Sequence, residues 1–270
     1  MKIAPLVLTF VAAATVALGA AAAPPEREDM RRVGPAVYRP FYPASPKEKE
    51  IPLPAFDLDR LPVTNAAFLA FVKRNPAWQR GAVSRLFADA GYLSRWRAPT
   101  ELGEVDPRGP VIDVSWFAAK AFCAERGARL PTEAEWELAA TAGEKSADAR
   151  NEPAWRARIL DWYATPMRSL SPVGSTPPNF WGVQDLHGVV WEWVLDFNST
   201  LVASDARESG DKDKNRFCGA GALAADETTD YPSFMRIAFR SSLRADFTTH
   251  SLGFRCARPV PQAPQERKKP

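Results

Sequence analysis

Proline restricts what this chain can fold into more than any other residue type. It occurs 25 times, and because proline lacks a backbone N–H and clashes with the preceding helical turn, it disfavours long helices and interior strands. Amphipathic helical patterns in the sequence are accordingly short. Nine tryptophans and 15 phenylalanines provide large apolar side chains. We therefore predict an α+β fold with little regular secondary structure, in which many loops pack on an aromatic core.

Residues 1–23 have the pattern of a secretory signal peptide. Lys2 precedes an uncharged, largely apolar run from Ile3 to Leu18, and small residues and a proline pair follow; this order matches the charged, apolar and cleavage regions of such peptides. A membrane anchor is the alternative, but a spanning helix needs about 20 predominantly apolar residues, and this run depends heavily on weakly apolar alanine. We predict cleavage near Ala22 or Ala23, a periplasmic or secreted protein, and no membrane attachment after cleavage.

The remaining sequence divides into a lead, one domain and a tail. Residues 24–50 form a charged, proline-containing lead, residues 51–260 are long enough for a single mixed domain, and residues 261–270 form a Pro- and Gln-containing tail that is typical of disorder. The chain has 35 basic and 32 acidic residues, a net charge of +3, and the two signs are well mixed. This balance gives no reason to expect a nucleic-acid partner.

Local patterns place a strand and two helices in the first half of the domain. The alternation of apolar and polar residues at 55–58 predicts a short strand. A helix that begins at Thr64 or Asn65 and stops before Pro76 would bury one apolar stripe, formed by Phe68, Leu69, Phe71 and Val72. A second helix is expected from Ser115 to Glu125, with Gly127 as its end signal.

A third helix start is the sharpest local signal in the chain. Thr132 and Glu135 have the spacing of a capping box, in which each side chain accepts a hydrogen bond from the backbone N–H of the other. Gly143 is the expected stop, and the inner stripe consists of Trp136, Ala139 and Ala140. Residues 144–178 and 198–230 carry no periodic pattern, so we predict that both are irregular.

The chain has three cysteines, Cys123, Cys218 and Cys256. In an oxidising compartment an odd number leaves one thiol over, because at most one intramolecular disulfide can form. Spacing alone does not say which pair closes.

The segment GVQDLHGVVWEW, residues 182–193, concentrates polar side chains among tryptophans. A catalytic acid/base pair, a transition-metal site, an oxygen-ligand metal site and a polar turn are all compatible with it. Asp185 and Glu192 offer hard oxygen ligands, and the turn at Gly188 can direct the carbonyls of Gly188 and Val190 to the same point, as Ca²⁺ requires. His187 is expected to be a surface or turn residue, because a transition-metal site needs more imidazole or thiolate ligands nearby.

Three further motifs give the chain a family resemblance. RLPTEAEWE, the G-x-x-W-E-W pattern within residues 188–193, and GFRCA occur in that order. Together with LPVTNAAFLAFV they resemble the formylglycine-generating enzyme family, also called the sulfatase-modifying factor domain, from about Ile51 to Pro259. The resemblance implies a variant of the C-type lectin-like fold and a disulfide between Cys123 and Cys256, which leaves Cys218 as the odd thiol.

The resemblance also implies a structural calcium site. Relatives bind the ion through a side chain at the position of Asp185, the carbonyls of Gly188 and Val190, and the carboxylate of Glu192. A second family site would lie in residues 144–178, where no matching ligand set is found, so we expect one Ca²⁺. The alternative is that Asp185 only caps the turn while Glu192 pairs with an arginine.

The family's copper chemistry has no matching residues here. Members that make formylglycine resemble one another in two thiols that bind copper just before an Arg-x-Ala-x-Arg stretch, which corresponds to Arg236–Arg240. Soft thiolates suit Cu(I), but the two thiol positions fall near Glu227 and Pro232. We therefore do not expect copper binding or formylglycine generation by the usual route.

The same face of the fold is the expected ligand site. It would present donors and cations to a small anionic or aromatic ligand, and its predicted residues are Cys218, Tyr231, Arg236, Arg240, Ser241, Ser242, Arg244 and His250. The alternative is that the three arginines form a solvated face or pair with the acidic loop at residues 226–230. No base oriented toward either serine marks a serine nucleophile.

Two functional hypotheses follow from these observations. In the first, the chain is an exported family member without the thiol pair that acts as a binding or accessory factor, similar to members associated with maturation of a periplasmic copper nitrite reductase, with a protein as its partner. In the second, it is an oxidoreductase of altered chemistry, either of the formylglycine-generating type or acting on a small aromatic metabolite. The first rests on fold-level analogy, and the missing metal–thiolate set favours it.

Overall fold

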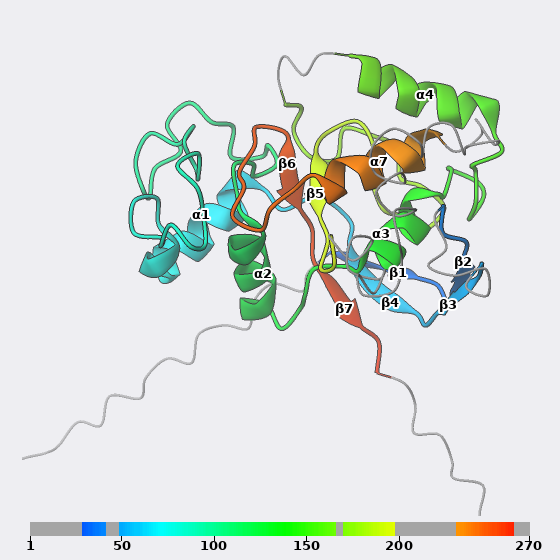
Figure 1. The fold of residues 1–270 in the computed structure, drawn as a ribbon, viewed down its shortest axis with the longest axis horizontal. Helices are drawn as coiled ribbons and strands as arrows, with labels where there is room; N and C mark the ends of the chain where they lie inside the picture. Colours follow the sequence, from blue (N-terminus) through cyan, green and yellow to red (C-terminus); the bar gives the residue numbers. More distant parts are fainter. Residues whose placement is uncertain (1–28, 42–48, 166–169, 198–230, 262–270) are drawn as a thin grey trace, which may run out of the picture.

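A computed structural model describes residues 29–41, 49–165, 170–197 and 231–261 (Figure 1). The predicted signal peptide, Cys218, the segment 198–230 and all but the first residue of the predicted tail lie outside the described residues. Within them, regular elements are few and short, as the proline content predicts. In the described part of the chain, no helix is both long and apolar enough to cross a membrane.

The strands form three small sheets. β1 (Met30–Val33), β4 (Phe56–Asp59) and β7 (Ala257–Pro259) make an antiparallel sheet in the order β1-β4-β7. The other two sheets are two-stranded: β2 (Ala36–Tyr38) pairs antiparallel with β3 (Ile51–Leu53), and β5 (Trp191–Trp193) pairs parallel with β6 (Leu252–Phe254).

Two of these strands lie within the predicted lead. β1 pairs with β4 along all four of its residues, and β2 pairs with β3. The folded part of the chain therefore begins before residue 51, where the sequence placed the domain boundary. The sheets and short helices together confirm an α+β fold with little regular secondary structure.

The three predicted helices are present, and each has a side-chain N-cap. In α1 (Asn65–Arg74) and α2 (Trp116–Glu125), the hydroxyls of Thr64 and Ser115 accept from backbone N–H groups of the first turn, and Gly127 follows α2 with a φ of 64°. A 3₁₀ turn, η1 (Pro76–Trp78), follows α1. In α3 (Glu133–Ala140) the capping box of Thr132 and Glu135 is complete in both directions.

Two more helices frame the upper right of the molecule in Figure 1. α4 (Pro153–Ala164) contradicts the prediction that residues 144–178 are irregular, and α7 spans Tyr231–Ser241. α4 has no side-chain cap, but Pro153 occupies its first turn, where a missing N–H costs nothing. It holds its place through Trp155 and Ile159, which are buried one helical turn apart.

The core is aromatic and is closed by the predicted disulfide. Phe68 of α1 lies at its centre, with ring centroids 5.3 Å from Phe71, 5.7 Å from Phe122 and 6.0 Å from Phe254. Cys123 of α2 is bonded to Cys256, between β6 and β7, with a Cα–Cα separation of 5.6 Å. The disulfide thus links the helical side of the core to the C-terminal strands.

Candidate functional site

The first feature of the predicted ligand face is a buried ion pair between α7 and α3. Arg236 donates through Nε and Nη2 to the Glu137 carboxylate over 2.7 to 3.1 Å, and both side chains are fully buried. Arg236 also donates to the Ser233 hydroxyl at 2.8 Å. Arg236 is therefore not part of a solvated face, because it is buried against Glu137, a glutamate of the RLPTEAEWE motif. The acidic loop at residues 226–230 lies outside the described residues.

Arg240 joins the same cluster one helical turn further along α7. Its Nη1 donates to Glu137 at 2.7 Å and lies 3.6 Å from Glu133, and its guanidinium stacks 4.3 Å above the Trp136 ring. Burial alone would raise the pKa of Glu137, but Arg236 and Arg240 outweigh it and hold the pKa at about 2. Burial raises the pKa of Glu133 to about 7, and Arg240 only partly offsets this. Glu137 therefore stays ionised between the two guanidinium groups.

Three further described members of the predicted ligand face have partners of their own. The hydroxyls of Ser241 and Ser242 donate to backbone carbonyls of α7 at 2.9 and 2.7 Å. Arg244 pairs with Asp246 beyond the helix end. Cys218 lies outside the described residues, and the two helical arginines point into the protein.

Tyr231 and His250 of this face are exposed, as Ser242 and Arg244 are. Tyr231 is exposed at the start of α7. His250 is also exposed, and its Nδ1 lies 2.7 Å from the buried carboxylate of Asp113, which has a φ of 57°. Burial raises the pKa of Asp113, and the neighbouring imidazole of His250 opposes this effect. The structure places His250 against the residues that precede α2.

An aromatic wall, formed by Trp162, Tyr163, Trp191 and Phe239, joins α4, β5 and α7. The Trp191 ring lies 4.6 Å from Phe239 and 5.1 Å from Tyr163 in stacked arrangements, and 5.4 Å from Trp162. All four side chains are half-buried. Offset-stacked rings with partly exposed faces suit another flat apolar group or a partner side chain. This wall was not predicted from the sequence, because the tryptophans were expected in the core and residues 144–178, which contain α4, were expected to be irregular.

The hydroxyl of Tyr163 connects the aromatic wall to the buried Arg236–Glu137 ion pair. It donates to the carbonyl of Pro232 and accepts from Arg236 Nη1, each at 3.3 Å. Burial raises the pKa of this phenol, so it stays neutral. Pro232, near which one of the family's two thiols would fall, is buried in the first turn of α7.

The predicted calcium residues have protein partners. Asp185, with a φ of 61°, accepts from the backbone N–H of Gly174 and from both the N–H and the hydroxyl of Thr176. Glu192 forms a two-point ion pair with the fully buried Arg255, at 2.7 and 2.8 Å, and accepts from the Trp136 indole at 2.7 Å. These contacts match the alternative to a calcium site, in which Asp185 caps the turn and Glu192 pairs with an arginine.

The same contacts leave acceptor capacity at the predicted site. Asp185 Oδ2 and Glu192 Oε1 each accept one hydrogen bond from the described residues, and a carboxylate oxygen has two lone pairs. A cation here could therefore use one carboxylate oxygen from Asp185, one from Glu192, and the backbone carbonyls of Gly188 and Val190. Among the described residues, no three His, Cys, Asp or Glu side chains gather as a metal-binding group.

His187 occupies the turn between these two carboxylates. Its Nε2 lies 2.8 Å from the carbonyl oxygen of Ala140, and its ring makes edge contacts with Trp136 and Trp155. Burial lowers the pKa of this imidazole to about 3. His187 is a turn residue, as predicted, but it packs against the core as a neutral ring.

Comparison with known families decides the relationship that these motifs suggest. A family profile described as "Sulfatase-modifying factor enzyme 1-like domain" matches residues 11–260. The chain belongs to the sulfatase-modifying factor family. The chain is 30% identical over 258 residues to the inactive C-alpha-formylglycine-generating enzyme 2 of Bos taurus, with 81% of this chain and 82% of that protein covered. It is 33% identical over 247 residues to the formylglycine-generating enzyme of Streptomyces coelicolor, with 75% and 77% covered.

A solved structure is similar to this sulfatase-modifying factor domain. PvdO from Pseudomonas aeruginosa aligns over 86% of this chain and 92% of its own, with a TM-score of 0.45 and 20% identity.

The cysteines of this family member can now be assigned. Cys123 and Cys256 form the disulfide, as the resemblance implied. The chain has three cysteines in all, so only Cys218 can carry a free thiol. One chain therefore cannot supply the two thiolates that the family's copper site uses.

Proposed function

We propose that this family member is exported and acts as a binding or accessory factor in the maturation of a periplasmic metalloenzyme. The observation that carries the proposal is the Cys123–Cys256 disulfide, which leaves one cysteine for a chemistry that needs a pair of thiolates. The similarity to a relative named as an inactive formylglycine-generating enzyme supports the same view.

The aromatic wall is the surface that we assign to the partner. Its rings come from three elements, α4, β5 and α7, so its geometry is fixed by the fold. Large half-exposed aromatic side chains are the residue type that contributes most at protein interfaces. Because Arg236 and Arg240 are already paired with Glu137, recognition here would depend on apolar contact more than on charge.

A cellular experiment tests the accessory role. We would delete the gene and measure the metal content of the periplasmic metalloenzymes by mass spectrometry after fractionation. The proposal expects a metalloenzyme that is synthesised and exported but underloaded, with loading restored by the wild-type chain. Trp191→Ala should fail to restore it, whereas Phe180→Ala, which truncates an exposed aromatic outside the wall, should restore it. Full metal loading in the deletion strain would refute the proposal.

Enzymatic activity is tested directly with the purified protein. A peptide with the cysteine motif of sulfatases is incubated with the protein, Cu(I) and oxygen, and the aldehyde product is detected by mass spectrometry. The Streptomyces coelicolor relative serves as the positive control. We expect no aldehyde, because Cys218 alone cannot replace a thiol pair.

The second candidate function is an oxidoreductase of altered chemistry. It is favoured by the similarity to a relative named as a formylglycine-generating enzyme. Anaerobic copper titration separates the candidates: stoichiometric Cu(I) binding that survives Cys218→Ser but is lost in His250→Ala would establish a new metal site and favour the enzyme.

Export is tested by fractionation and N-terminal sequencing of the mature chain. We expect the protein in the periplasm or the medium, with its first residue near Pro24. An unprocessed chain that stays with the membrane would instead support the anchor alternative.

A further inference from the structure

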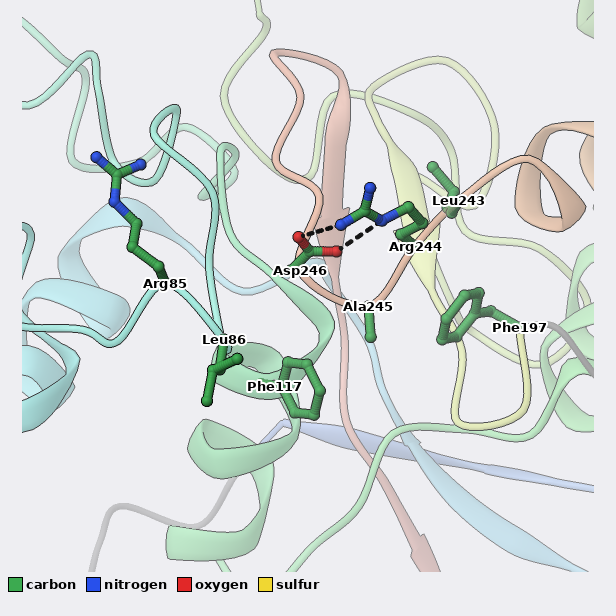
Figure 2. Close-up of a pocket in the computed structure, with 8 residues that line it drawn as sticks. All are labelled: Arg85, Leu86, Phe117, Phe197, Leu243, Arg244, Ala245 and Asp246. Carbon is green, nitrogen blue, oxygen red and sulfur yellow. Dashed lines mark hydrogen bonds and ion pairs between the residues drawn. The ribbon is translucent and has the colours of Figure 1, made fainter.

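A cavity of about 520 Å³ lies beside α2, away from the residues of the aromatic wall. Figure 2 shows its lining, which includes Phe117 in the first turn of α2, Phe197 after β5, and the segment after α7. Known ligand cavities have volumes of roughly 300 to 1,000 Å³. The volume therefore suits a small molecule.

The cavity walls are held by hydrogen bonds and ring contacts. The backbone N–H of Trp116 donates to the carbonyl of Ala245 at 3.0 Å, and the N–H of Asp89 donates to the carbonyl of Asp246 at 2.9 Å. The centroid of the Trp116 ring lies 5.4 Å from that of Phe117 and 6.2 Å from that of Phe197. A ligand would thus meet a preformed apolar surface.

The polar part of the lining is the Arg244–Asp246 ion pair, in which one N–H group of Arg244 remains available to donate. Arg244 donates to the two Asp246 oxygens through Nε and Nη2, at 3.1 and 2.8 Å (Figure 2). Its Nη1 has no partner among the described residues, so it can still donate. Asp246 is the one acidic lining residue, and both of its oxygens are taken by Arg244.

A second cation, Arg85, lines the cavity. It extends away from the ion pair in Figure 2, and in the described part of the chain it makes no ion pair or hydrogen bond. Arg85 and Arg244, against the single carboxylate of Asp246, give the lining a net positive charge.

We infer that this cavity binds a small organic anion with a flat apolar body. The body would pack between Phe117 and Phe197, and the acidic group would accept hydrogen bonds from Nη1 of Arg244. A guanidinium is suited to a carboxylate or sulfonate because its planar N–H groups are arranged to meet two oxygens. The inference does not depend on the proposed accessory role, since the cavity shares no residue with the aromatic wall.

The test compares two probes of similar shape, one with an anionic carboxylate and one with a neutral amide in its place. Binding of 2-naphthoate and of naphthalene-2-carboxamide to the full-length protein is measured by isothermal titration calorimetry at low ionic strength. We expect saturable one-to-one binding of 2-naphthoate and binding at least tenfold weaker for the neutral amide. Absence of saturable naphthoate binding, or equal binding of both probes, would overturn the inference.

Variants locate the site. Arg244→Met should remove the preference for the anion, because it deletes the donor and frees the Asp246 carboxylate. Asp246→Asn should keep or strengthen naphthoate binding, since Arg244 then loses its counter-charge. Phe117→Ala should weaken the binding of both probes by a similar factor.

A matched control guards against general electrostatic effects. Arg32→Met removes an arginine that is also exposed and also paired with an aspartate, but on β1. Arg32→Met should change the affinity for neither probe, and circular dichroism should show that every variant is folded. Naphthoate binding that survives in Arg244→Met and in Phe117→Ala would place the probe elsewhere and refute the assignment.

Discussion

Glu137 and Arg236 meet in a fully buried ion pair between α3 and α7, and Arg240 adds a second guanidinium to the same carboxylate. The pair joins residues that are 99 positions apart in the sequence. It fixes α7 against the helix of the RLPTEAEWE motif. The arginines that resemble a ligand-binding set in the sequence therefore hold the domain together.

Removing the central carboxylate should be costly. In Glu137→Gln two buried guanidinium groups lose their counter-charge, and breaking a buried pair in this way costs about 3 to 5 kcal/mol. The free energy of unfolding from urea titration measures the loss. As a control, Glu101→Gln breaks the exposed pair with Arg97 and should cost less than about 1 kcal/mol. Equal losses in the two variants would contradict the structural role.

Stability should depend on the protonation of Glu133. Burial raises its pKa from 4.5 in the unfolded chain to about 7 in the fold. The folded state then binds the proton more tightly, so this stabilisation is complete below pH 4.5 and is lost as pH rises toward 7. A shift of this size corresponds to a contribution on the order of 3 kcal/mol.

The variant Glu133→Gln isolates this effect. His187 acts in the opposite direction over part of the same range, because burial lowers its pKa from 6.5 to about 3. The difference between variant and wild type removes the His187 contribution. We expect the stability of Glu133→Gln relative to wild type to increase between pH 4.5 and 7.5, whereas the exposed Glu144→Gln should show no such trend. A constant difference would show that Glu133 titrates normally.

The cysteines give a third prediction. Unreduced, unfolded protein should react with one equivalent of a thiol reagent, at Cys218, because Cys123 and Cys256 are bonded. The bond spans 133 residues, and closing a loop of that size stabilises a fold by about 5 kcal/mol in the chain-entropy model. The double variant Cys123→Ala/Cys256→Ala should lose much of this stabilisation, measured as the free energy of unfolding. Cys218→Ala should lose almost none of it. Peptide mapping that found Cys218 in the bridge would overturn the assignment.

Calcium gives the fourth prediction. We propose one structural ion at Asp185, the carbonyls of Gly188 and Val190, and Glu192. Chelation should then lower the melting temperature, and added Ca²⁺ should restore it, because a ligand that binds only the folded state stabilises it. Asp185→Asn keeps an oxygen acceptor and tolerates a positive φ, and it should abolish the response. A wild-type protein indifferent to chelation would show that Asp185 only caps its turn and Glu192 only pairs with Arg255.

Elements defined by neighbouring residues could be predicted from the sequence. The caps at Thr64, Ser115 and Thr132 are local patterns, and the structure confirms all three helices. α4 was missed because it lacks a side-chain cap, although Pro153 and the spacing of Trp155 and Ile159 were available as signals.

Pairings between distant segments could not be predicted in the same way. The arginines of α7 lie close in sequence to the acidic loop at 226–230, but packing of α7 on α3 brings Glu137 to them instead. The aromatic wall depends on three elements that meet only in the fold. The disulfide was available through family resemblance, and not from cysteine spacing.

The position of Arg255, Cys256 and β7 in the chain has a consequence for biosynthesis. These residues supply the ion pair to Glu192, the bond to Cys123 and the third strand of the main sheet, and the ribosome makes them after every partner. A nascent chain cannot make these three connections until Arg255, Cys256 and β7 have been synthesised. Under the proposed export, the chain would therefore cross the membrane before these connections form.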